Sequence, residues 1–219
     1  VNLKNNTVDD WFKNGKTWVP NVDVSKWCES GNTGANTAGE NNPTSPEESV
    51  VVKGKAAKLQ STWIGFIGIG AFASASMFTG NFVDIDGTNG ILSFGQPFTA
   101  KPTKLTGYYK YTPVNIDYME QWDSKVDPDL KSGDSDQCII YIALCTKNYE
   151  IRTNPKSRQL FDPNDASVIA YGELVAKEAV SGEEANGYNK FSIDIKYRKK
   201  DVTPSYIVVV DAAASFTYE

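Results

Sequence analysis

The residues with the clearest chemical potential are the aromatic and cationic side chains of one extended stretch, Leu105 to Tyr111. Side chains alternate along a strand, so Tyr109 and Tyr111 share one face, and Tyr108 and Lys110 share the other. We expect one pair to face a core. The other pair would then present an aromatic ring at the surface.

A second aromatic candidate, Trp122, lies in the polar segment between residues 113 and 136. Flat aromatic faces and a few fixed polar groups suit a ring-shaped ligand rich in hydroxyl groups. We predict that Trp122 and Tyr108 are exposed and stack on such a ligand, with Lys110 beside them. The alternative for each ring is packing in the core or at an edge.

Trp18 and Trp27 precede a long polar stretch, residues 29–49, which we read as a surface loop. They are further candidates for ligand contact. The alternative is that these tryptophans close one end of the fold.

Carboxylates could serve glycoside hydrolysis or calcium binding. Hydrolysis needs two carboxylates about 5–10 Å apart across a cleft, and no pair stands out by spacing. Calcium prefers oxygen ligands, which Asp84 and Asp86 could supply, although an ordinary turn explains the same residues. No other cofactor is expected. The carboxylates considered are Asp84, Asp86, Asp117, Glu120, Asp123, Asp162 and Asp165.

The composition excludes several classes of site and partner. The chain has 219 residues, no histidine and a formal net charge of −5. The lack of histidine removes Ser-His-Asp catalysis and histidine–zinc sites. The acidic balance argues against nucleic acid as a partner. No run approaches the roughly 20 apolar residues of a membrane span, and no leader sequence is evident.

Three cysteines leave one unpaired in any scheme. Cys138 and Cys145 are seven residues apart, so on one strand they face opposite sides and cannot bridge each other. A bridge from Cys28 to either remains open, and buried free thiols are the alternative.

The periodicity predicts an all-β fold with long loops. Gln137 to Cys145 is continuously apolar, as in a central strand buried on both faces, and Phe191 to Arg198 alternates cleanly. We also expect a short strand at Val50 to Val52, and a buried strand followed by a loop in the apolar region Trp63 to Phe78. Residues 1–219 are predicted to form a single antiparallel β-sandwich of two sheets, a jelly roll of the galactose-binding type.

Several stretches, in order along nearly the whole chain, resemble the putative carbohydrate metabolism domain of Bacteroidetes surface proteins. They are Thr17–Asn21, Lys55–Leu59, Phe78–Gly80, Leu105–Pro113, Asp136–Cys138, Tyr141–Leu144, Phe161–Pro163, Ile169–Gly172 and Pro204–Val210.

The resemblance implies a jelly-roll sandwich like that of carbohydrate-binding modules, on secreted or lipid-anchored proteins of gut bacteria. It also implies a glycine-rich loop after the strand that matches Ile207–Val210. Here Asp211–Ala214 runs almost directly into Ser215–Glu219, so we expect residues to be absent near Ala214. No catalytic residues carry over.

The leading hypothesis is therefore a non-catalytic glycan-binding module at the cell surface or outside the cell. A lipid anchor would lie upstream of this chain. One alternative is a structural or adhesive module that binds a protein, and another is a weak glycoside hydrolase.

Overall fold

The structure is a computed structural model that describes residues 3–21, 27–66, 69–87, 89–117 and 131–213. Regular structure in these residues is almost entirely β-strand, and the helices are short turns. The elements are β1 (Phe12–Asn14), β2 (Thr17–Val19), β3 (Cys28–Ser30), α1 (Asn32–Ala35), η1 (Asn36–Ala38), β4 (Thr44–Glu47), β5 (Ala56–Leu59), β6 (Thr62–Phe66), β7 (Ile69–Ala73), β8 (Ala75–Asp86), β9 (Asn89–Phe94), β10 (Gln96–Pro97), β11 (Lys104–Tyr109), β12 (Cys138–Cys145), β13 (Tyr149–Arg152), η2 (Pro155–Ser157), β14 (Val168–Ala176), η3 (Ala185–Gly187), β15 (Asn189–Asp194), β16 (Lys196–Tyr197) and β17 (Tyr206–Ala213).

The main layer is a curved antiparallel sheet, which comprises nine strands within the described residues. Its order is β13-β9-β8-β17-β12-β14-β16, with β10 beside β17 and β3 beside β8. Every residue of β12 is buried, which confirms the prediction of a central strand covered on both faces.

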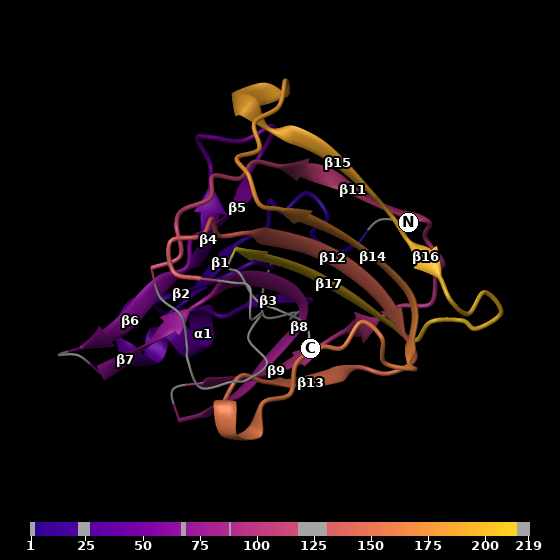
Figure 1. Cartoon of the computed structure of the whole chain (residues 1–219), viewed down its shortest axis with the longest axis horizontal. Coiled ribbons are helices and arrows are strands. Elements are labelled where there is room, and N and C mark those ends of the chain that lie inside the picture. The colour runs from indigo at the N-terminus through magenta and orange to yellow at the C-terminus, as the bar shows by residue number, and fades with distance from the viewer. Residues whose placement is uncertain (1–2, 22–26, 67–68, 88, 118–130, 214–219) are drawn as a thin grey trace.

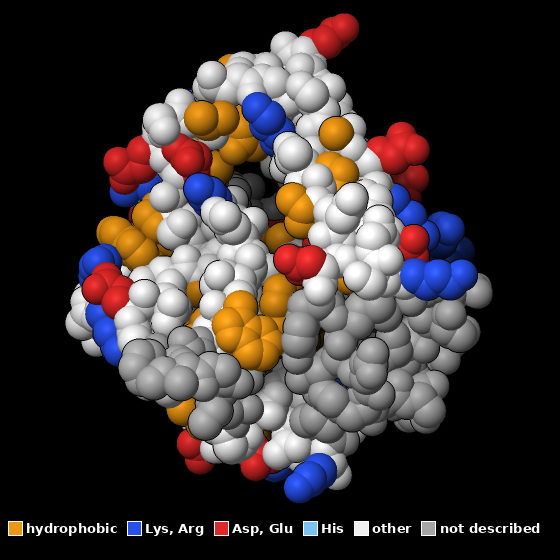
Figure 2. Space-filling model, turned by 60° about the vertical axis from the view of Figure 1, so that its left-hand side comes forward, with side chains coloured by type: hydrophobic (Ala, Val, Ile, Leu, Met, Phe, Trp, Pro, Cys, Tyr) orange, Lys and Arg blue, Asp and Glu red, His pale blue; other side chains and the backbone are white. Residues whose placement is uncertain are grey.

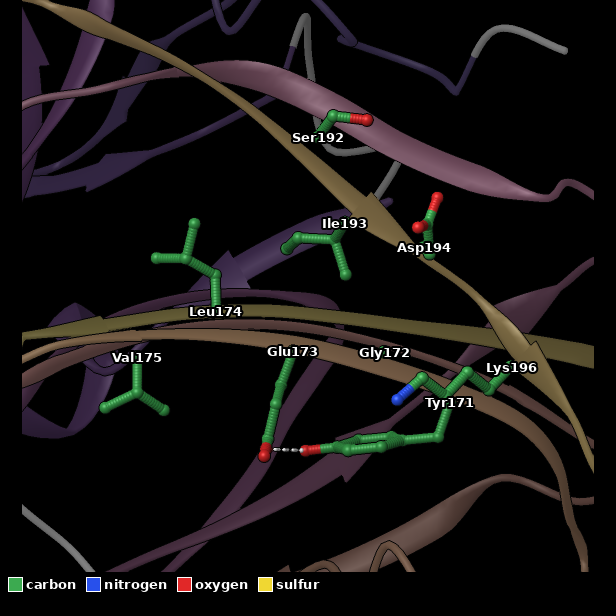
Figure 3. Close-up of a pocket in the computed structure, with 9 residues that line it drawn as sticks. All are labelled: Tyr171, Gly172, Glu173, Leu174, Val175, Ser192, Ile193, Asp194 and Lys196. Atoms are coloured by element: carbon green, nitrogen blue, oxygen red, sulfur yellow. Dashed lines mark hydrogen bonds between the residues drawn. The ribbon is translucent and has the colours of Figure 1, made fainter.

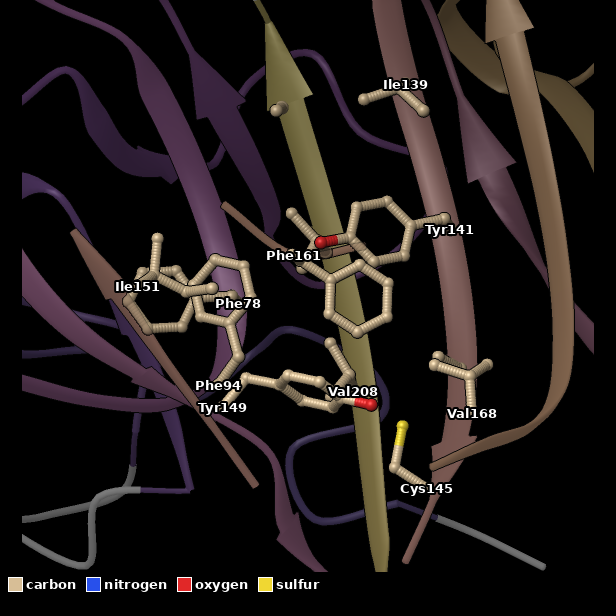
Figure 4. Packing of buried hydrophobic residues seen from close by; sticks show 13 residues of the cluster. Phe78, Phe94, Ile139, Tyr141, Cys145, Tyr149, Ile151, Phe161, Val168 and Val208 are labelled. Carbon is tan, nitrogen blue, oxygen red and sulfur yellow. The ribbon is translucent and has the colours of Figure 1, made fainter. Parts of the chain in front are cut away.

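The two faces of β12 belong to two separate cores. Tyr141 and Cys145 point into a first cluster, where the ring of Phe161 stacks on Tyr141 at 5.4 Å between centroids (Figure 4). Ile142 and Leu144 point into a second cluster on the opposite face. This period-two alternation gives one strand contacts in both layers of the protein.

The second core is covered by a two-stranded ribbon of β11 and β15, which forms the smaller layer of the sandwich (Figure 1). Leu105, Tyr109, Phe191 and Ile193 pack inward from this ribbon. The burial of β11 alternates residue by residue, as predicted from the sequence. Together the two layers make an antiparallel β-sandwich.

The ribbon and the main sheet share a continuous stretch of chain. β15 pairs with β11 through Asp194, and two residues later Lys196 and Tyr197 of β16 pair with β14. The chain thus starts in the outer ribbon and ends in the main sheet. Gly172 of β14 lies where the two layers meet, because a Cβ atom there would approach the carbonyl oxygen of Asp194 to 2.5 Å.

The prediction of a surface loop over residues 29–49 is wrong. The segment contains α1, η1 and β4, and Asn32 and Thr44 are fully buried within it. Asn32 donates through Nδ2 to the carbonyl oxygens of Trp18 and Thr44, and its Oδ1 accepts from the Thr44 amide. Asparagine side chains supply hydrogen bonds that a strand would otherwise provide, so a composition typical of loops conceals an ordered segment.

Two further expectations about strands are corrected. Val50 to Val52 forms bends and no strand. The region from Trp63 to Phe78 is a hairpin of β6 and β7 followed by the start of β8, and Trp63 is exposed. Apolar composition alone does not distinguish a buried strand from an apolar hairpin at the surface.

Two of the three cysteines lie on β12. Cys138 and Cys145 occupy opposite faces of β12 as predicted, and all three cysteines are buried and free.

The region after Ala213, where we expected absent residues, lies outside the described residues, as does Trp122. No helix in the described part of the chain has the length and apolar character needed to cross a membrane.

Candidate functional site: an aromatic face beside a groove

The outer face of the β11–β15 ribbon is a ladder of three side-chain pairs. Pairing in register sets Lys104 opposite Asp194, Thr106 opposite Ser192, and Tyr108 opposite Lys190; all six residues are exposed. Lys104 and Asp194 form an ion pair at 3.3 Å at one end. The ladder therefore runs from an ion pair, through two hydroxyl groups, to an aromatic ring.

Tyr108 is the exposed aromatic residue of this face, with 46% of its surface accessible. Lys110 lies two positions further along the same face, and its Nζ donates to the carbonyl oxygen of Asn186 at 3.1 Å. Lys190 stands across the ribbon. Two lysine residues thus neighbour Tyr108, one along the strand and one across the ribbon, and hydroxyl groups lie one step along the strands.

The inner face of the ribbon holds this ladder in position. The ring of Phe191 meets Tyr109 edge-on at 5.9 Å and also lies over Gly107, where a Cβ atom would come within 2.7 Å of it. Gly107 therefore allows the ribbon to lie directly on an aromatic layer. Burial is the main cause that raises the pKa of the Tyr111 hydroxyl, and the nearby negative charges of Asp136 and Cys138 add to it. This hydroxyl is enclosed without a hydrogen-bond partner in the described structure.

A groove of about 430 Å³ adjoins the ladder between β14 and β15. Figure 3 shows Leu174 and Ile193 pointing into the space between the strands, while Ser192 and Asp194 point outward from β15. Ser192 and Asp194 belong to both surfaces, so the groove and the aromatic face are continuous.

The groove contains two carboxylates that do not face each other. Glu173 accepts a hydrogen bond from the Tyr171 hydroxyl at 2.6 Å on one side of β14, whereas Asp194 points to the other side (Figure 3). Burial is the main cause that raises the pKa of the Tyr171 hydroxyl, and the hydrogen bond to Glu173 adds to it. This arrangement differs from the facing pair that glycoside hydrolysis requires.

Two of the other candidates, Trp18 and Trp27, do not share the face of Tyr108. Trp27 is half-buried against the second core, with its Nε1 enclosed and without a hydrogen-bond partner in the described part of the chain. Trp18 is half-buried on β2, where the Lys13 ammonium lies 5.3 Å from its ring centre. Tyr108 and Lys110 are therefore the predicted residues that share one face.

The predicted calcium ligands lie on β8, away from the ladder. Asp86 accepts from Asn154 Nδ2 at 2.8 Å and from Ser157 Oγ at 3.2 Å, and Asp84 accepts from the Ile85 amide. These partners are hydrogen-bond donors, whereas a cation would be surrounded by acceptors. Within the described residues, no three side chains of His, Cys, Asp or Glu gather in a group that could hold a metal ion.

Sequence reasoning did not single out Trp63 and Phe72 as exposed partners. They are opposite each other in the β6–β7 hairpin, and 47% and 38% of their surfaces are accessible. The spacing of glycines around them, at Gly65 and Gly70, was the available signal, because glycine interrupts the packing face of a buried strand.

The chain matches one known family of protein domains. The family described as "Putative carbohydrate metabolism domain" matches residues 5–217, nearly the whole length. The chain belongs to this family. No curated protein and no solved structure matches it.

Proposed function

We propose that this member of the putative carbohydrate metabolism domain family is a non-catalytic carbohydrate-binding module. The observation that carries the proposal is the exposed ring of Tyr108 on a polar ladder that opens into a groove. Membership of the family supports a role connected with carbohydrate.

The ladder offers the groups that a sugar ring needs. The apolar C–H face of a pyranose stacks on Tyr108, and the ammonium groups of Lys190 and Lys110 donate to its oxygens. The hydroxyl groups of Ser192 and Thr106 reach the next sugar of a chain, which then enters the groove between β14 and β15.

The resemblance to surface proteins of Bacteroidetes leads us to place the protein outside the cell or on the outer membrane, in a secreted or lipid-anchored protein. In that setting it would capture glycans for the bacterium that produces it. Neither nucleic acid nor a bilayer is the expected partner, given the net charge of −5.

A second candidate function, binding of a protein partner, is favoured by the edge of β14. Within the described residues, β16 pairs with β14 only at Ala170 and Tyr171, so the stretch from Gly172 to Ala176 has no strand partner on that side. Val175 in this stretch is 42% exposed. A strand edge of this kind can accept an extended segment of another chain.

A glycan array and a titration with the best-bound sugar test the proposal. Tyr108→Ala should weaken binding by about tenfold or more, and Tyr108→Phe should retain most of it, because the ring rather than the hydroxyl makes the contact. Lys101→Ala, an exposed lysine outside the ladder, is the matched control. A silent array, together with a protein partner recovered through the β14 edge, would favour the second candidate.

A further inference from the structure

The hairpin of β6 and β7 forms a small sheet of its own. Its strands pair with each other from Thr62 opposite Ala73 to Phe66 opposite Ile69, and neither pairs with another strand in the described structure. Figure 1 shows the hairpin projecting at one end of the molecule, away from the β11–β15 ribbon. A surface on this hairpin is therefore separate from the ladder around Tyr108.

One face of the hairpin carries two large aromatic side chains. Trp63 and Phe72 are register partners, so their side chains share a face, and both are exposed. Ile64, the next residue along β6, points to the opposite face and is only 8% exposed. One side of the hairpin is thus anchored in the protein, while the other presents aromatic surface to solvent.

On the same face, the positions next to the aromatic pair are occupied by glycines. Gly65 and Gly70 are the next register pair on this face, two positions along each strand, and neither has a side chain. The aromatic pair therefore stands at the border of a flat strip of backbone. A flat ring-shaped ligand can lie over this strip with its apolar side against an indole.

The sequence stretches that contain the hairpin and the neighbouring η1 have no charged residues. No Asp, Glu, Lys or Arg occurs between Lys58 and Asp84, or between Glu29 and Glu40 in the segment with α1 and η1. β6 also contacts η1, whose residues carry no charge. Figure 2 views the molecule with this side turned forward, and hydrophobic side chains are exposed near the middle of that view.

We propose that the Trp63–Phe72 face is a second glycan-binding surface, which takes a neutral pyranose stacked on the indole and lying over the glycine strip. The inference rests on the proposed function and adds a site and a sugar class to it. A neutral ligand is favoured because the described residues of the hairpin carry no charged side chain that could pair with an ion, and the exposed rings favour a ligand with an apolar side.

The test compares Trp63→Ala and Phe72→Ala with Val114→Ala, an exposed apolar residue outside both surfaces. Binding of a neutral oligosaccharide selected on the array is measured by calorimetry, and thermal unfolding verifies that each variant is folded. We expect Trp63→Ala to lower the affinity by about tenfold or more, and Trp63→Phe to lower it less. Val114→Ala should leave it unchanged.

A measurement on the unaltered protein removes any dependence on how the variants fold. Hydroxyl-radical footprinting at saturating oligosaccharide should protect Trp63 from oxidation. An unprotected Trp63, with affinities equal in Trp63→Ala and the control, would overturn the second surface while leaving the glycan proposal for Tyr108 intact. A silent array would instead remove the proposed function itself.

Other occupants give distinct outcomes. A dimer in light-scattering measurements that Trp63→Ala abolishes, with no effect of sugar, would assign the face to a second copy of the chain. Sedimentation with neutral phosphatidylcholine vesicles that depends on Trp63 would assign it to a lipid surface. Either result overturns the inference.

Discussion

Asp211 is a carboxylate whose register neighbours on both sides are apolar side chains. It lies on β17, opposite Ile140 of β12 and Met77 of β8. Burial raises its pKa to about 7, and its charge in turn helps to raise the pKa of the thiols of Cys28 and Cys138. The neutral acid is therefore the form that fits the folded protein.

This raised pKa predicts that the protein is more stable in mild acid. An unfolded Asp211 would ionise near its ordinary pKa of 3.8, so its stabilising contribution is complete below that pH and is lost as the pH rises through about 7. The free energy of unfolding should fall by roughly 2–4 kcal/mol between about pH 4 and pH 8. Denaturant titrations at several pH values measure this slope.

Asp211→Asn keeps a neutral side chain of similar shape, so it should flatten the pH dependence and stabilise the protein above about pH 7. Asp201→Asn alters an exposed carboxylate and serves as the control. An unchanged slope in Asp211→Asn would show that this carboxyl group is well solvated.

At the scale of the element, the β11–β15 ribbon depends on a glycine. A Cβ atom on Gly107 would lie 2.7 Å from the Phe191 ring, so Gly107→Ala must displace that ring or lift the ribbon. We expect a loss of about 1–3 kcal/mol of stability, measured by denaturant unfolding. The double variant Gly107→Ala/Phe191→Leu should recover part of the loss, because a smaller side chain leaves room for the methyl group. Additive effects of the two substitutions would contradict this contact.

The segment of α1, η1 and β4 depends on one buried amide. Asn32→Ala removes three hydrogen bonds to the backbone and leaves buried donors and acceptors behind, so we expect a loss of about 3 kcal/mol or more. Hydrogen exchange should accelerate at the Thr44 amide in particular. Asn164→Ala, at an exposed turn, is the control and should change stability by less than about 0.5 kcal/mol.

The sequence predicted elements best where solvent covers one face. Ile193 and Ile195 are buried while Ser192 and Asp194 are exposed, so a period of two was visible over this stretch. The prediction failed where side-chain hydrogen bonds take the place of pairing with another strand, as at Asn32. A local sequence pattern indicates which side chains are buried, but it does not indicate hydrogen bonds between residues far apart in the chain.

The candidate site was predictable to the same extent. Alternation placed Tyr108 and Lys110 on one face of β11, but it could not decide which face lay outward. That choice depends on the match with β15 and on Phe191, both far away in the chain. The exposure of Trp63 was missed because an apolar run is usually a buried one.

At the scale of the whole molecule, the three thiols report on the integrity of the buried interior. Cys28, Cys138 and Cys145 are buried and free, and burial raises their pKa values to between about 11 and about 12. A thiol reagent at neutral pH should therefore react very slowly with the native protein and with three groups after denaturation. Reductant should leave the melting temperature unchanged, whereas a lowered one would reveal a disulfide.

The passage of the chain from β15 into β16 has a mechanical consequence. Because a single stretch of backbone is bonded to the ribbon at one end and to β14 at the other, it works as a strap across the two layers. Tension applied to either layer is carried by covalent bonds into the other. The ribbon should therefore resist being peeled away until the edge of the main sheet itself gives way.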